Sequence, residues 1–160
     1  MAPSIQYDPS KDFAGQVESL AWQVDVAIFE LPGRATNYWL KDYPTDSCSN
    51  VSYIMGHVLA DYGFGDWTWV EGSNEASYGH TWLELREYGA AEPLWSLDST
   101  AHQFAGFERP FLVRGPSPLA ETHSNDTKAH RISLLPRCFR LSAYVESLDG
   151  VRAILSASAA

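Results

Sequence analysis

One segment constrains the fold of this chain more than any other: a helical pattern followed directly by three strand-like stretches. The helical pattern starts after Asp46 and Ser47, which are favourable N-cap residues, and it stops at Gly63. Apolar residues recur at helical spacing along one face of this predicted helix, at Val51, Ile54, Met55, Val58 and Leu59. We therefore expect this face to be buried against another element of the fold.

The three strand-like stretches that follow are short, and they cover residues 67–71, 80–86 and 94–98. Residues 87–93 separate the last two stretches, and this segment contains Gly89 and Pro93, as a hairpin-like connection does. A hairpin makes its two strands antiparallel. The sequence thus predicts an α+β fold in which a helix packs on an antiparallel sheet.

The rest of the chain carries weaker signals. Apolar residues at spacings of three and four predict an amphipathic helix over residues 11–31, which Pro32 and Gly33 end. The loop signal Gly115-Pro116-Ser117-Pro118 and a polar stretch at 121–128 precede the last expected elements. These are strands at 132–135 and 138–141 and a terminal helix at 145–155, with fraying over 156–160.

Length and composition favour one domain with a packed core. The 160 residues are 45% hydrophobic, and we assign a single domain over 1–160. It comprises an N-terminal helix at 11–31, a core at about 43–104 and a C-terminal extension at 105–160. The formal charge of −9 disfavours nucleic acid and anionic membranes as partners. We find no apolar run of about 20 residues and no basic leader, so we expect a cytoplasmic protein; the oligomeric state stays open.

Cys48 is the first candidate for chemistry, because it falls in the first turn of the predicted helix. A cysteine acts as a nucleophile in its thiolate form, which the free N–H groups of a helix start favour. The alternative is that Cys48 is a small buried apolar residue. Cys138 lacks a comparable context, and we expect it to be structural. Two distant cysteines supply neither a disulfide framework nor a Cys-rich zinc motif.

His80 and Asp98 are the candidates that would complete a catalytic set with Cys48. His80 opens one predicted strand and Asp98 closes the next. If these strands pair antiparallel, the two side chains come near the same end of the sheet. The imidazole would then take the thiol proton while the carboxylate orients the ring. The alternatives are a buried core histidine and an aspartate that caps the turn at Ser99 and Thr100.

In this order and spacing, three segments resemble the transglutaminase-like and papain-like cysteine enzymes. They are Asp42-Tyr43-Pro44-Thr45-Asp46-Ser47-Cys48-Ser49-Asn50-Val51-Ser52, Gly79-His80-Thr81-Trp82-Leu83-Glu84-Leu85 and Trp95-Ser96-Leu97-Asp98-Ser99-Thr100-Ala101-His102-Gln103-Phe104. The resemblance implies a papain-like or transglutaminase-like core, with Cys48 as nucleophile, His80 as base and Asp98 as orienting group. It also implies attack on an amide or other acyl carbonyl through a thioester.

The resemblance does not identify the acyl acceptor or the oxyanion donor. Water as acceptor would make the protein an amidase, deamidase or peptidase, and an amine would make it an acyl or amine transferase. Members of this group often place a side-chain oxyanion donor before the cysteine, and here only Tyr43 and Trp39 are candidates. We therefore name Tyr43 as a substrate-site residue. The substrate would be a peptide, a protein or a small amide or acyl compound.

Aromatic and polar residues near the candidate site have two interpretations each. Trp67, Trp69 and Trp82 either pack the sheet or form an aromatic surface on which substrate stacks. Gln103 and Phe104 either support the site or belong to the core.

The remaining histidines do not indicate a metal site. We expect His57 to pack or to be partly exposed on its helix, and His123 and His130 to be solvated. His80 and Glu84 share a strand face, but no zinc motif occurs, so we predict no metal and no cofactor. Glu84 is expected to support neighbouring polar groups.

A second function from another class is a non-catalytic binding module on the same scaffold, which would recognise a partner through an aromatic-rich cleft. The complete set of Cys48, His80 and Asp98 argues against it, because a site without catalysis does not need all three residues.

Overall fold

The structure is a computed structural model that describes residues 7–136 and 141–158. Its α-helices within these ranges are α1 (Phe13–Glu30), α2 (Cys48–Asp61) and α3 (Ser142–Ser158). Its strands are β1 (Thr68–Ser73), β2 (Gly79–Leu85), β3 (Trp95–Asp98), β4 (Phe111–Arg114) and β5 (Asn125–Arg131). No helix in the part of the chain described has both the length and the apolar character that a bilayer crossing requires.

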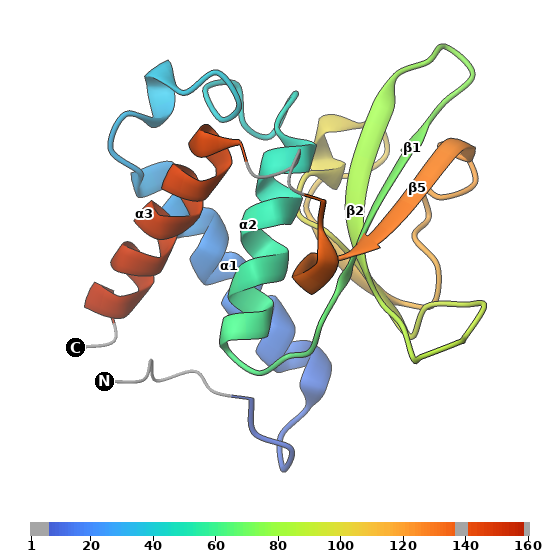
Figure 1. Ribbon diagram of the computed structural model, residues 1–160, viewed down its shortest axis with the longest axis horizontal. Helices are drawn as coiled ribbons and strands as arrows, with labels where there is room; N and C mark the ends of the chain where they lie inside the picture. The colour runs from blue at the N-terminus through green and yellow to red at the C-terminus, as the bar shows by residue number, and fades with distance from the viewer. Residues whose placement is uncertain (1–6, 137–140, 159–160) are drawn as a thin grey trace.

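The five strands form one sheet in the order β4-β3-β2-β1-β5, and every neighbouring pair is antiparallel. The helices pack on one side of the molecule and the sheet forms the other (Figure 1). The predicted α+β class, the antiparallel sheet and the hairpin between β2 and β3 are therefore confirmed.

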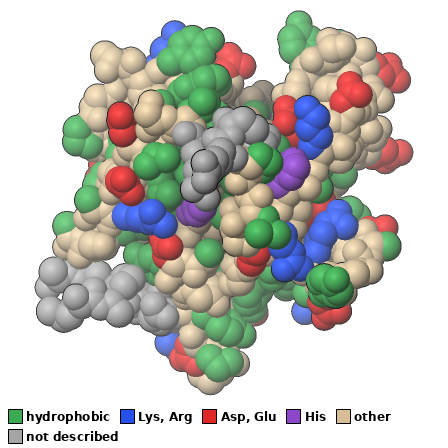
Figure 2. All heavy atoms as spheres, in the orientation of Figure 1, with side chains coloured by type: hydrophobic (Ala, Val, Ile, Leu, Met, Phe, Trp, Pro, Cys, Tyr) green, Lys and Arg blue, Asp and Glu red, His purple; other side chains and the backbone are tan. Residues whose placement is uncertain are grey.

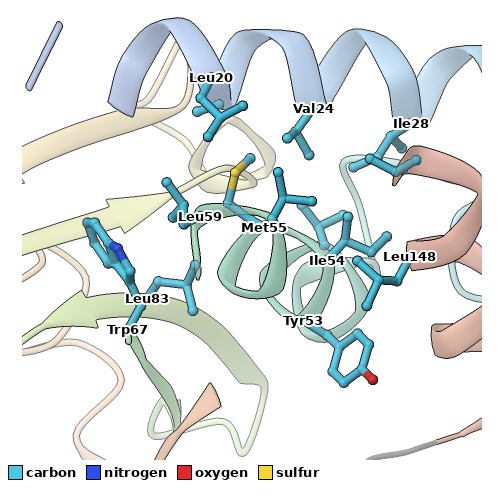
Figure 3. Close-up of a cluster of buried hydrophobic side chains, with 14 of the residues drawn as sticks. Leu20, Val24, Ile28, Tyr53, Ile54, Met55, Leu59, Trp67, Leu83 and Leu148 are labelled. Carbon is cyan, nitrogen blue, oxygen red and sulfur yellow. The ribbon is translucent and has the colours of Figure 1, made fainter. Parts of the chain in front are cut away.

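Helix α2 lies in the centre of the fold, with the sheet on one side and α1 and α3 on the other (Figure 1). Figure 3 shows Leu20, Val24 and Ile28 of α1 pointing toward Ile54, Met55 and Leu59 of α2. All six side chains are fully buried. Burial of each such side chain contributes about 1.5–3 kcal/mol, so this contact is a large part of what fixes α2 in place.

The ends of the first two helices follow the sequence signals. Asp12 caps α1 by accepting a hydrogen bond from the Gly15 N–H at 2.7 Å, and the helix ends directly before Leu31 and Pro32. Helix α2 starts at Cys48 with Ser47 as its N-cap residue, and Gly63 follows its end with a positive φ of 85°.

The C-terminal third differs from the prediction. Strand β4 was not anticipated, and β5 overlaps the stretch that was expected to be a polar loop. Six of the seven β5 residues are exposed, so this edge strand is held by backbone pairing to β1 and carries no alternating apolar pattern. The expected strand at 132–135 is instead a short 3₁₀ helix, Ile132–Leu134.

Helix α3 is longer than predicted. It starts at Ser142 and continues to Ser158, through residues that were expected to fray. Its buried residues Tyr144, Leu148, Val151 and Leu155 belong to the same hydrophobic core as α1 and α2. The C-terminal extension is therefore an integral part of the fold. The expected strand at 138–141 lies, except for Leu141, outside the described residues.

Candidate active site

Three elements bring Cys48, His80 and Asp98 together. Cys48 is the first residue of α2, His80 is the second residue of β2, and Asp98 is the last residue of β3. The β2–β3 register pairs Leu83 with Leu97. Asp98 lies one residue beyond this pair on β3, and His80 lies three residues before Leu83 on β2, so the two side chains are diagonal neighbours across the strands. The antiparallel arrangement predicted from the sequence thus delivers the imidazole and the carboxylate to the same end of the sheet.

His80 and Asp98 form a short, buried pair. The distance between His80 Nε2 and Asp98 Oδ2 is 2.6 Å, and both side chains are inaccessible to solvent. The other carboxylate oxygen, Oδ1, accepts hydrogen bonds from the Thr100 N–H at 2.9 Å and from the Thr100 hydroxyl at 3.3 Å. Asp98 is therefore fixed from both sides, as a group that orients an imidazole must be.

The environment of His80 favours its protonated form. Burial by itself lowers the pKa of His80, but the hydrogen bond to Asp98 and the neighbouring Cys48 outweigh this effect, and the pKa rises to about 9. The second ring nitrogen, Nδ1, is buried and makes no hydrogen bond within the described residues. His80 thus presents one nitrogen to Asp98, and Cys48 lies close enough to the ring to help raise its pKa.

The start of α2 leaves its backbone N–H groups available near Cys48. The Ser47 side chain does not cap the helix; its hydroxyl donates to the Pro44 carbonyl at 2.9 Å instead. The first N–H groups of a helix have no partner inside the helix and attract negative charge. A hydrogen bond of 3.0 Å between the hydroxyls of Ser49 and Thr81 joins this first turn to β2, and Cys48 itself remains partly exposed.

Aromatic rings surround the His80 imidazole. Trp82 lies nearly parallel to it, with ring centroids 6.0 Å apart, and Phe104 contacts it edge-on at 4.6 Å. The Trp82 indole donates to Glu84 at 2.9 Å, and Glu84 in turn accepts from the Arg86 guanidinium. Glu84 therefore has the supporting role expected for it, and Phe104, whose role was left open, packs against the site. These contacts restrict the ring to one orientation.

Trp67 and Trp69 do not form a surface for substrate. Their side chains are 0% and 2% exposed and belong to the hydrophobic core. The indole N–H of Trp67 donates to the Phe64 carbonyl at 3.1 Å. The prediction of a stacking surface is wrong for this pair, because both side chains belong to the core that α2 shares with the sheet. Trp82 is also buried, at 2%, and contacts His80 from inside the protein.

Tyr43 is buried and its hydroxyl is already engaged. It donates to Asp25 of α1 at 2.8 Å and lies 3.4 Å from the Ser99 carbonyl. Burial and the Asp25 carboxylate raise the pKa of Tyr43 well above its ordinary value. A hydroxyl with one hydrogen, held by Asp25, does not serve as an oxyanion donor, so the expected substrate role of Tyr43 is not supported.

Tyr144 of α3 is a residue near the site that the sequence did not indicate. It is 5% exposed, and its ring makes edge contact with Trp39 at 5.5 Å. Burial, followed by the neighbouring Cys48 and Glu71, raises the pKa of Tyr144 to about 12, and a hydrogen bond with Ser49 acts in the opposite direction. No motif surrounds Tyr144, and only the packing of α3 against α2 brings it here.

His123 is buried, not solvated as predicted. It is 4% exposed, and its ring centroid lies 5.5 Å from that of His80. The segment before β5 approaches β1 so closely that a Cβ atom at Gly72 would lie 1.9 Å from the His123 carbonyl oxygen. Glycine at this one position lets a polar loop dock against the site. Burial lowers the pKa of His123, which keeps a second positive charge away from His80.

The other two predicted histidines are only partly accessible to solvent, so His130 is less solvated than expected. His130 is half-buried on β5, and His57 is partly exposed on α2, where it contacts the Tyr53 ring at 4.5 Å. Cys138 lies outside the described residues. Among residues 7–136 and 141–158, no three His, Cys, Asp or Glu side chains are grouped as a metal site requires.

The upper outline of the molecule is notched between the helical side and the β1–β2 hairpin (Figure 2). Cys48 is the first residue of α2, and His80 lies near the start of β2. The three groups brought together are the Cys48 thiol, the buried His80 imidazole and the fixed Asp98 carboxylate. Such a set can take a proton from a bound molecule and return it.

The chain matches no known family model, no curated protein and no solved structure.

Proposed function

We propose that this protein is a cysteine-dependent enzyme that cleaves or transfers an acyl group through a Cys48 thioester. The observation that carries the proposal is the buried His80–Asp98 pair, whose free Nδ1 atom is accompanied by Cys48 at an uncapped helix start. Two other histidines among the described residues, His102 and His123, also have a buried ring nitrogen without a partner. His80 differs from them because it pairs with Asp98 and because the neighbouring Cys48 helps to raise its pKa.

The proposed reaction has two stages. Cys48 attacks the carbonyl carbon as thiolate, and the new C–S bond replaces the C–N bond of an amide while the His80 proton moves to the departing amine. His80, now neutral, accepts a proton from water or from a second amine as that nucleophile attacks the thioester. The C–S bond breaks, and the proton on His80 restores the starting pair with Cys48. Asp98 stays ionised and stabilises the imidazolium at each stage.

The negative oxygen that forms on the substrate carbonyl needs at least one hydrogen-bond donor. We assign this role to a free backbone N–H group in the first turn of α2 and to the Tyr144 hydroxyl. The raised pKa of Tyr144, to about 12, keeps its proton in place at neutral pH. Its burial beside Cys48 and Ser49 supports the assignment.

The arrangement of elements supports a papain-like or transglutaminase-like core as the finer description of the fold. In that core a cysteine helix precedes a histidine strand, which is followed by an aspartate strand. The chain has this order in α2, β2 and β3, and α2 packs on the sheet.

Selective alkylation tests whether Cys48 is activated. Iodoacetamide near pH 7 is expected to modify Cys48 at least about tenfold faster than Cys138, as followed by peptide mass spectrometry. Cys138→Ser serves as the matched control and should leave the fast phase unchanged. Equally slow labelling of both thiols would contradict the proposal and favour a binding module.

Trapping of the acyl-enzyme tests turnover itself. The protein is incubated with a library of peptides and amines, quenched with acid, and analysed by intact mass. A mass increase on the wild type that is absent from Cys48→Ala, and that hydroxylamine removes, would identify a thioester. Turnover that survives in Cys48→Ala would contradict covalent catalysis by this thiol.

A further inference from the structure

A cavity of about 460 Å³ lies between α1 and the β3–β4 edge of the sheet, and Cys48, His80 and Asp98 do not line it. One stripe of α1 faces it, with residues at helical spacing: Glu18, Ala21, Trp22 and Asp25. The opposite side consists of Leu97 from β3 and Arg109, Pro110, Phe111 and Leu112 from β4 and the segment before it. The cavity is thus separate from the candidate active site.

Asp25 is an ionisable group inside this cavity without a cationic partner. Its side chain is 9% exposed, and only Oδ1 is hydrogen-bonded, to the Tyr43 hydroxyl. Among the described residues, no basic side chain lies within 4.0 Å of the carboxylate, and this includes Arg109 on the cavity lining. Burial raises the pKa of Asp25 to about 6, so the carboxylate is largely ionised at pH 7.5.

A buried carboxylate without a counter-charge is unfavourable, and a bound cation would relieve this cost. The lining also supplies apolar contacts, because Leu97 is buried and Phe111 and Leu112 are half-buried. The Trp22 indole is 69% exposed at the same cavity. An indole attracts cations through its ring face and packs against flat apolar groups.

We propose that this cavity is a binding site for an organic ammonium ion with an apolar or aromatic body. The ammonium group pairs with the free Oδ2 atom of Asp25. The body packs between the Trp22 indole and the apolar side chains of β3 and β4. Neutral compounds of the same shape lack the charge that Asp25 needs. The lining carries the acidic residues Asp25 and Glu18 against the single basic residue Arg109, so its net charge is negative and disfavours anions.

Titration with benzylammonium chloride tests the site. The full chain carrying Cys48→Ala is used, so that no thiol chemistry can consume the amine. Binding is followed at pH 7.5 by calorimetry and by amide NMR shifts. We expect saturable one-to-one binding with shifts at Trp22, Asp25 and Phe111, and benzyl alcohol, the neutral analogue, should bind at least about tenfold more weakly.

Three variants locate the contact. Asp25→Asn keeps an acceptor for Tyr43 but removes the charge, and it should weaken benzylammonium binding at least about tenfold. Glu18→Gln, the matched control on the same stripe of α1, should weaken it less than about threefold because Glu18 is exposed. Trp22→Ala changes an exposed side chain and should weaken it by about threefold or more.

Absence of saturable binding, equal affinity for benzyl alcohol, or unchanged affinity in Asp25→Asn would each overturn the proposal. If the thermal melt shows that Asp25→Asn does not fold, the Trp22→Ala variant takes its place as the test. Unchanged affinity of Trp22→Ala for benzylammonium would then overturn the proposal.

Discussion

At the scale of single residues, the contacts of Asp98 explain why the imidazole of His80 is both charged and fixed. Asp98 accepts from His80 through one oxygen and from Thr100 through the other, so its own rotation is blocked. Trp82 and Phe104 then limit the position of the ring. Asp98 therefore contributes to both the charge and the orientation of the ring, whereas Trp82 and Phe104 contribute to its orientation alone.

Asp98→Asn should reduce the reactivity of the site and leave the fold intact. The amide keeps the shape but cannot stabilise the imidazolium or hold the correct tautomer, so acyl transfer should fall by roughly 10²- to 10⁴-fold. The alkylation rate of Cys48 at pH 7 measures the loss without a known substrate. Thr100→Val, which removes only the 3.3 Å hydroxyl contact, is the milder control. An unchanged alkylation rate in Asp98→Asn would show that the pair does not act on Cys48.

The charge on His80 should appear in the pH dependence of stability. Its pKa is about 9 in the folded protein against 6.5 for an ordinary imidazole, so the folded state holds the proton more tightly. This stabilisation is complete below pH 6.5 and is lost as the pH rises through 9. Urea unfolding of wild type and His80→Gln over this range should show the loss only in the wild type. If His80→Gln lost the same stability over this pH range, the loss would belong to a titrating group other than His80.

Asp25 should change the free energy of unfolding in a lower pH range than His80. Burial raises its pKa from 3.8 to about 6, so the folded state favours the protonated form. The free energy of unfolding should therefore fall as the pH rises from about 4 to about 6, by roughly 3 kcal/mol at most. In Asp25→Asn this slope should be absent, as measured by urea unfolding. Glu18→Gln, on the same face of α1, should retain it.

At the scale of elements, the loop before β5 illustrates how a close backbone contact can place a side chain beside the candidate site. The loop carries His123 to the rings around His80, and the close approach of its carbonyl to Gly72 makes this possible. The same position is a bulge in the β1–β5 pairing, between Glu71 and Ser73. Bulges commonly redirect a strand at the edge of a sheet, and this one makes room for the loop.

Gly72→Ala should therefore displace the loop. A Cβ atom would lie 1.9 Å from the His123 carbonyl oxygen, which is backbone and cannot turn away. We expect a loss of about 2 kcal/mol in the free energy of unfolding, together with slower alkylation of Cys48. Gly79→Ala on the paired strand is the matched control, because its nearest neighbour is at an ordinary 3.9 Å. Equal stability of the two variants would show that the loop adapts.

At the scale of the whole molecule, α3 connects the end of the chain to the candidate site. Leu148, Val151 and Leu155 are buried in the core that α1 and α2 share, and Tyr144 extends from the same helix toward Cys48. Arg152 adds two hydrogen bonds, of 2.7 and 3.0 Å, to Asp61 at the end of α2. The two ends of α2 are thus both in contact with α3.

Leu148→Ala should weaken the fold as a whole. Loss of this fully packed side chain is expected to cost about 2–5 kcal/mol in the free energy of unfolding. The measurement is chemical unfolding followed by tryptophan fluorescence. Glu146→Ala, exposed on the same helix, should change stability by less than about 0.5 kcal/mol. A small effect of Leu148→Ala would mean that α3 only rests on a core that is complete without it.

The elements with regular local patterns could be predicted from the amino-acid sequence. The helix that starts at Cys48, the β2–β3 hairpin and the placement of His80 and Asp98 at its ends all follow from local spacing and turn residues. These features depend on contacts between residues close in sequence, so periodicity reports them directly. The polar edge strand β5 has no such periodicity, because its hydrogen bonds involve the backbone alone.

Which side chains surround the site depends on packing between distant segments, and the sequence did not reveal it. The burial of His123, the hydrogen bond between Tyr43 and Asp25, and the approach of Tyr144 to Cys48 join residues from distant parts of the chain. A polar residue in a polar stretch has the same sequence context whether it is solvated or buried. Its environment is set by the elements that pack over it, and packing between distant segments leaves no local pattern in the sequence.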